Sequence, residues 1–375
     1  MKILQVITSL ETGGAETLVV NLVPKFRALG HEVDVCVFNG KRTPLMERLE
    51  KENYGIKIWR LGNGYYNLLY ILKLMRIMKQ YDIVHTHNSS PQLFVAMAEV
   101  LCSVGLCSTE HTTSNRKRSW KWYAPIESWM YGRYNHIICI SQIAEEKLRE
   151  YMGGDWLREE TEKFQQISTV NNGVDVNQIY NAPLLSKGEQ KQEGDFVTTM
   201  VAGFREAKDQ DTLVRSLTLL PKNFKLWLVG IGARMEEVKT LAAELGVEDR
   251  VKFWGMRTDV PCILKSSDVV CMSSHWEGLS LSNVEGMSAG RPFIASDVDG
   301  LREVTKDYGL LFPNRDHQAL ATLIQQLHDD SAFYEKIAKR CYERAQAFDI
   351  SKMVEGYHHV YEAIFQSKNK KSIKH

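Results

Sequence analysis

Long apolar runs and a secretion signal are both absent from this sequence. No uninterrupted apolar stretch approaches the roughly 18 residues that a membrane-spanning helix needs. The first ten residues run into Glu11 and the Gly13-Gly14 pair without the small-residue cleavage site of a signal peptide. We therefore expect a cytoplasmic protein that neither spans a bilayer nor is exported. A peripheral contact with the inner face of the membrane stays open.

An excess of charge of one sign and paired cysteine motifs are also lacking. The 47 Lys and Arg residues nearly balance the 46 Asp and Glu residues, for a net charge of +1. This excludes the strongly basic surface field of many nucleic-acid-binding proteins. The seven cysteines form no CxxC motif, which favours reduced core thiols over a disulfide framework. At 375 residues, the chain is long enough for about two to three domains.

What the sequence does contain is a regular alternation of apolar strands and amphipathic helices. The first strand-like run, at 3–8, leads through a glycine-containing loop into a helix that stops at Gly30. Comparable strand-like runs follow at 33–38, 56–61, 82–87, 136–141 and 166–172. Continuous apolar strands that alternate with helices are typical of a parallel sheet covered on both faces. We place this first domain at residues 1–172.

A second set of strands and helices follows a polar stretch. Residues 173–195 lack periodicity and are expected to be a linker. Six further strand-like runs lie between residues 197 and 313, which indicates a second doubly wound domain at 196–350. The last segment has an apolar stripe at helical spacing, made of Ile350, Met353, Val354, Tyr357, Tyr361 and Ile364. Because such a face requires a partner, we expect helix 351–375 to cross back onto the first domain.

The predicted fold class is therefore α/β, with two doubly wound Rossmann-like domains facing across a cleft. Open α/β sheets bind ligands beyond the carboxyl ends of their strands. Two such sheets that face each other would direct those ends toward the same cleft. Functional residues are therefore expected in the strand-to-helix loops.

The most informative of these loops precedes a helix in the second domain. It holds Glu277, and Ser280 or Ser282 is placed to cap a helix that ends at Gly290. The free amides and the dipole of a helix start suit a phosphate without a metal. Carboxylates would repel a phosphate, so Glu277 and Glu285 are better suited to accept hydrogen bonds from sugar and ribose hydroxyls. Ser282 and Glu285 also fit a capping box, so a structural role for Glu285 stays open.

Glu277, seven intervening residues and Glu285, set within EGLSLSNVEGMSAGRP, resemble the signature of the retaining glycosyltransferases of family 4. The resemblance covers nearly the full chain in the order of the family. Its other segments are GGAE at 13–16, DIVHTH at 82–87, STEHT at 108–112, NNGVD at 171–175, KDQDTL at 208–213, LVGIG at 228–232 and WGMRTDV at 254–260. It implies the GT-B fold of two Rossmann-like domains and a nucleotide-sugar donor.

The resemblance also implies roles for individual residues. Glu285 would hold the ribose hydroxyls, and Glu277 would contact hydroxyls of the donor sugar. Lys208 matches the lysine that neutralises the diphosphate leaving group. The family's arginine falls on Gly203, so Arg205 is the candidate to replace it, with an ordinary surface position as the alternative. The amides expected to bind the donor are those of Gly278, Leu279, Ser280, Leu281 and Ser282.

Further candidates lie in the first domain. Gly13 and Gly14 open the first helix, where their amides can approach the donor closely. His111 lies in the loop after a strand-like run and could orient hydroxyls of donor or acceptor. His85 and His87 are more typical of structural histidines.

Neither a metal nor a nicotinamide cofactor is expected, and the nucleotide sugar is a co-substrate. Cys102, Cys107 and His111 have no fourth ligand at a suitable spacing. Gly230 and Gly232 match half of a dinucleotide fingerprint, but its third glycine is missing.

Residues 115–135 interleave Arg and Lys with Trp and Tyr. This mixture suits a membrane interface or the pyrophosphate of a lipid-linked sugar, and it equally suits a half-buried helix with extended cations. A nucleic-acid partner is not expected, because the patch is single and short.

We predict a metal-independent transferase that moves a sugar from a nucleoside-diphosphate sugar to a hydroxyl of a sugar or lipid-linked acceptor, with retention. The resemblance implies bacterial polysaccharide or glycolipid biosynthesis. The alternatives are a sugar-nucleotide epimerase or phosphorylase, a non-catalytic nucleotide-sugar-binding protein, and a dinucleotide dehydrogenase. Donor consumption with transfer to an acceptor would separate the first interpretation from the others.

Overall fold

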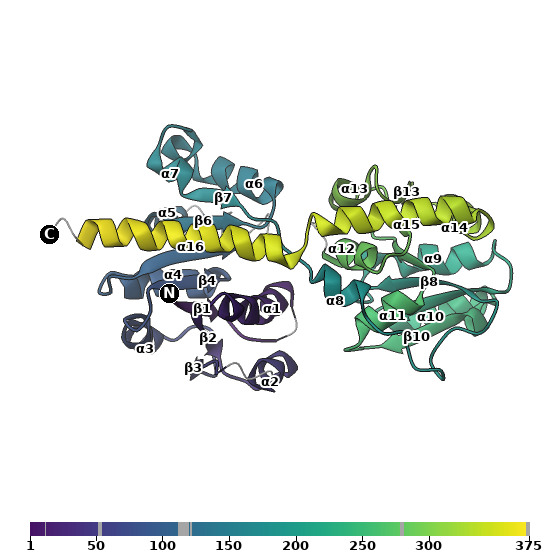
Figure 1. Ribbon diagram of the computed structural model, residues 1–375, viewed down its shortest axis with the longest axis horizontal. Coiled ribbons are helices and arrows are strands. Elements are labelled where there is room, and N and C mark those ends of the chain that lie inside the picture. The colour runs from purple at the N-terminus through teal and green to yellow at the C-terminus, as the bar shows by residue number, and fades with distance from the viewer. Residues whose placement is uncertain (12, 52–54, 112–119, 121, 278–280, 373–375) are drawn as a thin grey trace. The chain divides into compact units, whose positions relative to one another are not determined.

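The computed structural model describes residues 1–11, 13–51, 55–111, 120, 122–277 and 281–372. The chain forms two compact units (Figure 1). The first consists of Met1–Gly173 together with Ile350–His375, and the second of Val174–Asp349. Each unit is built on its own sheet of parallel strands.

The first unit holds a seven-stranded parallel sheet in the order β3-β2-β1-β4-β5-β6-β7. Its strands are β1 (Lys2–Ile7), β2 (Glu32–Asn39), β3 (Ile58–Gly62), β4 (Ile83–His87), β5 (Gly105–Glu110), β6 (His136–Cys139) and β7 (Ile167–Thr169). Successive side chains of a strand point to opposite faces, so Leu4 and Val6 enter one core cluster and Ile3 and Ile7 enter another.

Helices cover both faces of this sheet. One face carries α3 (Leu69–Met78), α4 (Ser89–Glu99), α5 (Ala124–Arg133) and α6 (Gln142–Met152). The other face carries α1 (Gly14–Ala28), α2 (Pro44–Lys51) and α16 (Ile350–Ser372). The short helices η2 (Gly154–Leu157) and α7 (Glu162–Gln165) precede β7. The predicted parallel sheet with two covered faces is confirmed.

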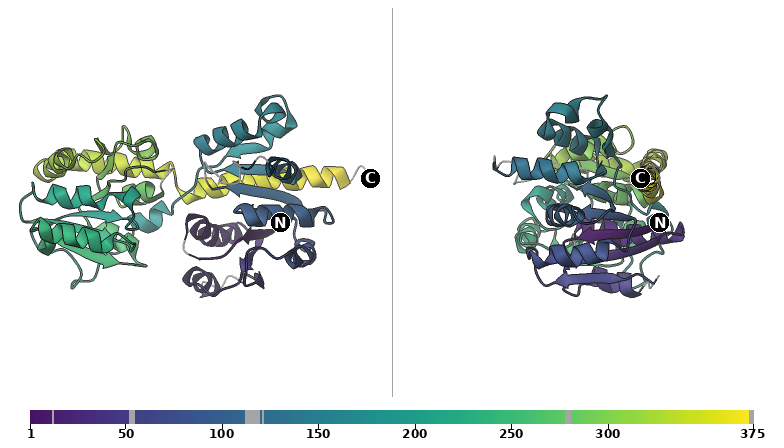
Figure 2. Two further views of the ribbon diagram at one scale, coloured as in Figure 1. Left: turned by 180° about the vertical axis from the view of Figure 1, so that it is seen from behind. Right: turned by 90° about the vertical axis from the view of Figure 1, so that its left-hand side faces the viewer.

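The C-terminal helix α16 packs against the first unit (Figure 1 and Figure 2). Its apolar stripe is buried in the core cluster shared with β1, β2 and α1: Ile350, Met353, Val354, Tyr357, Tyr361 and Ile364. The expected crossing of the last helix back onto the first unit is thus confirmed. Burial of this stripe is the physical reason that the chain returns.

The second unit holds a six-stranded parallel sheet in the order β10-β9-β8-β11-β12-β13. Its strands are β8 (Phe196–Val201), β9 (Phe224–Val229), β10 (Val251–Gly255), β11 (Val269–Met272), β12 (Phe293–Ser296) and β13 (Leu310–Phe312). Its helices are α8 (Val176–Tyr180), η3 (Glu206–Lys208), α9 (Gln210–Leu217), α10 (Met235–Glu244), η4 (Glu248–Arg250), α11 (Val260–Ser266), α12 (Leu281–Ser288), α13 (Asp299–Thr305), α14 (His317–Asp329) and α15 (Ser331–Gln346).

The segment expected to be a linker is instead part of the second unit. Leu185 is buried against Val197 of β8 and Ile263 of α11. Lys191 Nζ lies 2.5 Å from a carboxylate oxygen of Asp268. The segment is polar and aperiodic in sequence, but these contacts attach it to the sheet, so the second unit begins at Val174.

The buried positions of the cysteines agree with the expectation of core thiols. All seven cysteines are free thiols, and all but Cys262 are buried. None of the described helices combines the length and apolar character needed to cross a bilayer.

Gly173, where the chain leaves the first unit, permits the return of α16. A Cβ added to Gly173 would lie 2.6 Å from the Ile350 Cα, and a backbone atom cannot move aside cheaply. We therefore expect Gly173→Ala to lower the free energy of unfolding by about 1–3 kcal/mol, measured by urea denaturation. Gly188→Ala is the control, because a Cβ at Gly188 meets nothing within 4 Å. Equal midpoints for the two variants would contradict this view of the crossover.

Candidate functional site

The candidate site in the second unit lies where two neighbouring strands end. β8 and β11 pair in parallel, so their carboxyl ends share an edge and the loops that follow them meet. The Ser273 hydroxyl donates to the backbone oxygen of Asp209 at 2.7 Å, and the His275 amide donates to the Ala207 oxygen at 2.8 Å. These bonds hold the β8–α9 loop against the loop that precedes α12.

This contact brings two predicted site residues together. Lys208, at the end of η3, forms an ion pair with Glu277. The Ser274 hydroxyl donates to the same Glu277 oxygen at 2.7 Å. Both charged side chains are largely shielded, with 20% of Lys208 and 13% of Glu277 exposed. A cation and an acceptor for hydroxyl groups thus lie side by side at the edge of the sheet.

Glu285 lies on α12 and differs from Glu277 in its surroundings. Burial raises the pKa of its carboxyl to about 7. Within the described part of the chain, no hydrogen bond or ion pair engages this side chain. The capping-box interpretation is wrong, because α12 begins at Leu281 and Ser282 is already its second residue. A half-buried carboxyl without a structural partner is available to a ligand.

Arg205 occupies the space beside the glycine that replaces the family's arginine. It is exposed and directly precedes η3. A Cβ added to Gly203 would lie 3.8 Å from the Arg205 Nε. The Arg205 side chain therefore reaches back to the position from which an arginine at residue 203 would project.

Gly230 and Gly232 serve a packing role that explains their identity without a nucleotide. A Cβ on Gly230 would lie 2.2 Å from the Ala202 oxygen, and a Cβ on Gly232 would lie 2.3 Å from the Phe204 oxygen. Gly230 also has a φ of +137°, which L side chains rarely adopt. The two glycines let the loop after β9 pack directly on the backbone of the loop that leads to Lys208.

Of the predicted donor-binding amides, Gly278, Leu279 and Ser280 lie outside the described residues. Leu281 and Ser282 form the first turn of α12, where backbone amides have no partner within the helix. Asn283 follows them, fully buried, and neither polar atom of its side chain has a described hydrogen-bond partner.

Sequence reasoning missed His275 and Asn283. His275 Nδ1 lies 3.1 Å from the Asn314 Oδ1 and 3.5 Å from the Asp209 Oδ2. It therefore links three loops around the Lys208–Glu277 pair. Its place two residues before Glu277 was the available signal, whereas the partners on other loops could not be read from the sequence.

In the first unit, the candidates also lie beyond the carboxyl ends of strands. Gly13 is the N-cap of α1 and Gly14 its first residue, as predicted. A Cβ on Gly14 would meet nothing within 4 Å, so its identity is not required by packing. Ligand binding by these two glycines stays a prediction.

His111 directly follows β5 and belongs to a histidine cluster that sequence reasoning did not connect. Its Nε2 lies 2.9 Å from the Nδ1 of His87, the last residue of β4. Burial lowers the pKa of His111 to about 4, so the ring is neutral at pH 7. His85 and His87 are fully buried, which agrees with their expected structural character.

The aromatic and basic segment 115–135 is described only in part, since residues 115–119 and 121 lie outside the described residues. Trp120, Trp122 and Trp129 are each more than 40% exposed. Among the residues that the structure describes, no three His, Cys, Asp or Glu side chains gather as a metal site. The absence of a metal requirement stays a prediction.

Two family models match this chain. The model described as Glycosyltransferase Family 4 matches residues 12–178, and the model described as Glycosyl transferases group 1 matches residues 182–347. The first match begins after β1 and covers β2 to β7, and the second covers all six strands of the other sheet.

Similar proteins agree with the family matches. The chain is 27% identical to a Bacillus subtilis protein named as a glycosyltransferase, EpsD, over 90% of this chain and 91% of that protein. It is 26% identical to the Escherichia coli UDP-Gal:alpha-D-GlcNAc-diphosphoundecaprenol alpha-1,3-galactosyltransferase, over 77% of each chain.

The crystal structure of Anabaena Alr3699/HepE in complex with UDP shares the fold, with a TM-score of 0.80 at 21% identity. The match covers 97% of this chain and all of that one. The family matches and the two transferase relatives do not favour an epimerase, a phosphorylase, a dehydrogenase or a non-catalytic protein. The chain is therefore a glycosyltransferase of family 4, with the GT-B fold.

Proposed function

We propose that this enzyme transfers a sugar from a nucleoside-diphosphate sugar, with a UDP-sugar as the first donor to test, to an acceptor hydroxyl. The observation that supports this most directly is the Lys208–Glu277 pair beside the start of α12, with Glu285 four residues into the helix. The Anabaena neighbour was solved with UDP and with UDP-glucose, and the Escherichia coli relative is named for a UDP-galactose donor.

Each group has a distinct task in this proposal. Lys208 neutralises the diphosphate, whose charge grows as the glycosidic bond breaks. Glu277 accepts a hydrogen bond from a sugar hydroxyl, and Glu285 accepts hydrogen bonds from the ribose. Arg205 and the amides at the start of α12 complete the anion site of the second unit. Gly13 and Gly14 of the first unit are separate candidates for donor binding.

Retention, independence of metal and a cytoplasmic location are further parts of the proposal. Lys208, Arg205 and the helix amides would supply the positive charge that a divalent cation supplies elsewhere. Catalysis then depends on positioning and electrostatics rather than on a protein nucleophile. His111 would orient a substrate hydroxyl.

Glu285→Gln tests the ribose contact. Loss of a charged acceptor should weaken UDP binding about ten- to a hundredfold, measured by calorimetry at pH 8. The folded-state pKa of Glu285 lies above its unfolded value, so the carboxyl favours folding at low pH and that contribution is lost as the pH rises through about 7. The variant should therefore be at least as stable as wild type at pH 8.

The same variant gives a pH signature. If only the carboxylate binds ribose, the UDP affinity of the wild type should fall about tenfold for each pH unit below 7. The UDP affinity of Glu285→Gln should not show this fall. If Glu285→Gln is less stable than wild type but binds UDP with unchanged affinity, Glu285 is not a ligand-binding residue.

Lys208→Ala tests the leaving-group contact. Turnover should fall about a hundredfold or more, because charge stabilisation at the diphosphate is lost. This fall should be larger than the loss of stability that comes from leaving Glu277 without its cation. Donor-dependent turnover is measured with Lys222→Ala, an exposed lysine of the same unit, as the control. Wild-type turnover in Lys208→Ala would overturn its assignment.

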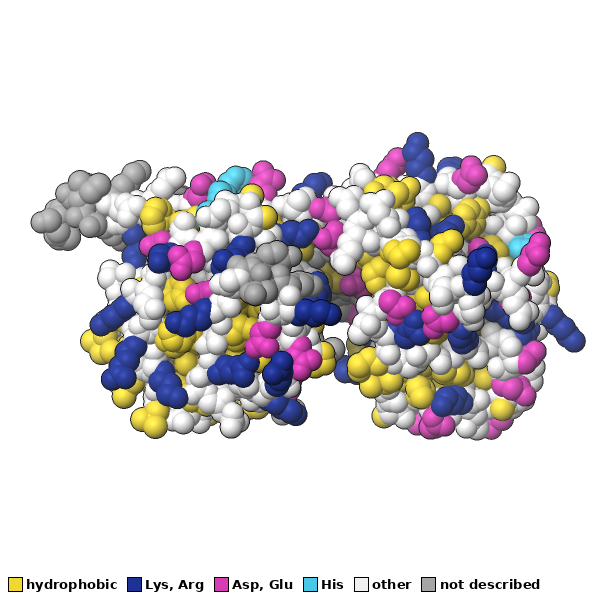
Figure 3. All heavy atoms as spheres, turned by 60° about the horizontal axis from the view of Figure 1, so that its bottom comes forward, with side chains coloured by type: hydrophobic (Ala, Val, Ile, Leu, Met, Phe, Trp, Pro, Cys, Tyr) yellow, Lys and Arg dark blue, Asp and Glu magenta, His cyan; other side chains and the backbone are white. Residues whose placement is uncertain are grey.

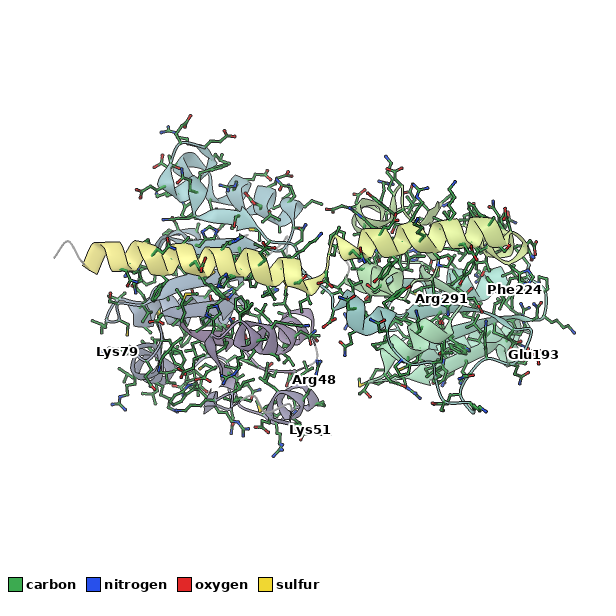
Figure 4. The ribbon with its side chains drawn as sticks, viewed as in Figure 1. Arg48, Lys51, Lys79, Glu193, Phe224 and Arg291 are labelled. Carbon is green, nitrogen blue, oxygen red and sulfur yellow. The ribbon has the colours of Figure 1, made fainter. Side chains whose placement is uncertain are left out.

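The acceptor is proposed to be lipid-linked and reached at a membrane surface. The segment 41–81 has nine Lys or Arg residues against three Glu, although the whole chain has a net charge of only +1. Figure 4 shows Arg48 and Lys51 of α2 and Lys79 after α3 in the first unit. A basic edge of this kind is attracted to anionic lipid headgroups.

Exposed apolar side chains accompany these cations. Leu68, Leu69 and Leu72 at the start of α3 are 74%, 62% and 56% exposed, and Tyr66 is 69% exposed. Figure 3 shows dark blue and yellow side chains interspersed over one face of this unit. Apolar groups that insert between headgroups, combined with cations, are typical of interfacial binding.

Leu69→Gln/Leu72→Gln tests this surface. Binding to phosphatidylglycerol vesicles in a sedimentation assay should weaken about tenfold, because two leucines lose their apolar contact with lipid. The double variant Leu184→Gln/Leu219→Gln is the control, since these leucines are similarly exposed on the second unit. Equal binding by both variants, or wild-type binding to vesicles of phosphatidylcholine alone, would contradict the proposed surface.

A further inference from the structure

A continuous hydrogen-bonded chain runs through the first unit and ends at His111. It joins side chains from three neighbouring strands, from the residue that follows β5, and from the C-terminal helix α16. Its members are Gln5 of β1, His85 and His87 of β4, Thr109 of β5, His111, and Tyr357 and Tyr361 of α16. Four of these six bonds involve His85 or His87 of β4. The other two are the Gln5–Tyr361 and Thr109–Tyr357 bonds.

The end of the chain that includes His111 is made of two histidines and an amide. His111 Nε2 lies 2.9 Å from the Nδ1 of His87. The other nitrogen of His87, Nε2, lies 2.8 Å from the Gln5 Oε1. An amide oxygen only accepts hydrogen bonds, so His87 carries its proton on Nε2.

The other end of the chain reaches α16. Gln5 Nε2 donates to the Tyr361 hydroxyl at 3.0 Å, and that hydroxyl lies 2.5 Å from the Nδ1 of His85. His85 Nε2 lies 2.7 Å from the Thr109 hydroxyl, which lies 3.2 Å from the hydroxyl of Tyr357. Because Tyr361 accepts from Gln5, its own proton is left for His85.

Burial keeps the three imidazole rings uncharged, so the remaining question is which nitrogen of each ring carries the proton. Gln5, His85 and His87 have no exposed surface. Burial lowers the pKa of His85 to about 3 and of His111 to about 4, and it holds the pKa of His87 well below its usual value. All three imidazoles are therefore neutral at pH 7, with one nitrogen a donor and the other an acceptor.

The donors then run in one direction along the chain. Since His87 uses its Nε2 proton on Gln5, its Nδ1 must accept, and His111 must donate from Nε2. The Nδ1 of His111 is left without a proton. Among the described residues none forms a hydrogen bond with that nitrogen.

We propose that Gln5, His87 and Tyr361 are positioning residues that hold His111 as its Nε2–H tautomer, so that Nδ1 is presented as an acceptor for a substrate hydroxyl. The catalytic use of this nitrogen rests on the proposed function of His111. The orientation of the Gln5 amide decides which nitrogen of His87, and therefore of His111, carries the proton. Reversing that amide would reverse every donor from Gln5 to His111 and place the proton on the Nδ1 of His111.

Nitrogen NMR of the full-length protein labelled with ¹⁵N-histidine tests the tautomer directly. The His111 signals are assigned by their loss in His111→Gln. In the wild type at pH 7, Nε2 should appear at the position of a protonated nitrogen and Nδ1 at that of a bare nitrogen. The opposite pattern in the wild type would overturn the proposal.

Tyr361→Phe and Tyr357→Phe form a matched pair. Both tyrosines are fully buried on α16, and each variant loses one hydroxyl. Tyr361→Phe removes the acceptor that orients Gln5, so the His111 Nε2 signal should move toward the bare position and turnover should fall about tenfold. Tyr357 is the far end of the chain, so its variant should keep the wild-type His111 signals and turnover within about twofold.

A structural role alone would make the two variants alike in NMR and in turnover, and that result would contradict the proposal. Donor affinity should be unchanged in Tyr357→Phe, because the Tyr357 hydroxyl lies at the far end of the chain from His111. His111→Gln separates the proposed function of His111 from the proposal that the hydrogen-bonded chain sets its tautomer. If its turnover equals that of wild type, the proposed function of His111 fails, while the NMR experiment still shows whether the chain of hydrogen bonds sets the tautomer.

Discussion

The parallel direction of all strands is the constraint on which both candidate sites depend. In a parallel sheet every strand-to-helix loop leaves at the same edge, so residues far apart in sequence meet there. Lys208 follows β8 and Glu277 follows β11, and the pairing of these two strands makes the ion pair possible. In the first unit, the pairing of β4 with β5 sets His87 beside His111 in the same way.

The return of α16 connects the end of the chain to the core of the first unit. The helix buries an apolar stripe, as any amphipathic helix in a globular protein must. It also places two tyrosine hydroxyls among polar side chains of β1, β4 and β5. Buried polar groups need partners, and here the C-terminal helix supplies them. The last helix is therefore part of the polar interior that leads to His111 as well as of the apolar core.

Several features could be predicted because they depend on local sequence. Continuous apolar runs indicated the strands, apolar residues at helical spacing indicated α16, and Lys208 and Glu277 were candidates by their motifs. The errors came where local pattern is ambiguous. Residues 174–195 look like a linker because they are polar, yet Leu185 and Lys191 attach them to the second unit. Ser282 and Glu285 match a capping box, yet the helix begins two residues too early for it.

By itself, the sequence determined the two parallel sheets, the return of the last helix, and which acidic and basic residues follow strands. These follow from the spacing of apolar residues and from turn chemistry, which act over a few neighbours. Only the tertiary structure decided which side chains become partners: Lys208 with Glu277, and His111 with His87 and, through Gln5, with Tyr361. Those partners are separated by 24 to 356 residues, and hydrogen bonds form only within about 3 Å, a condition that packing alone sets.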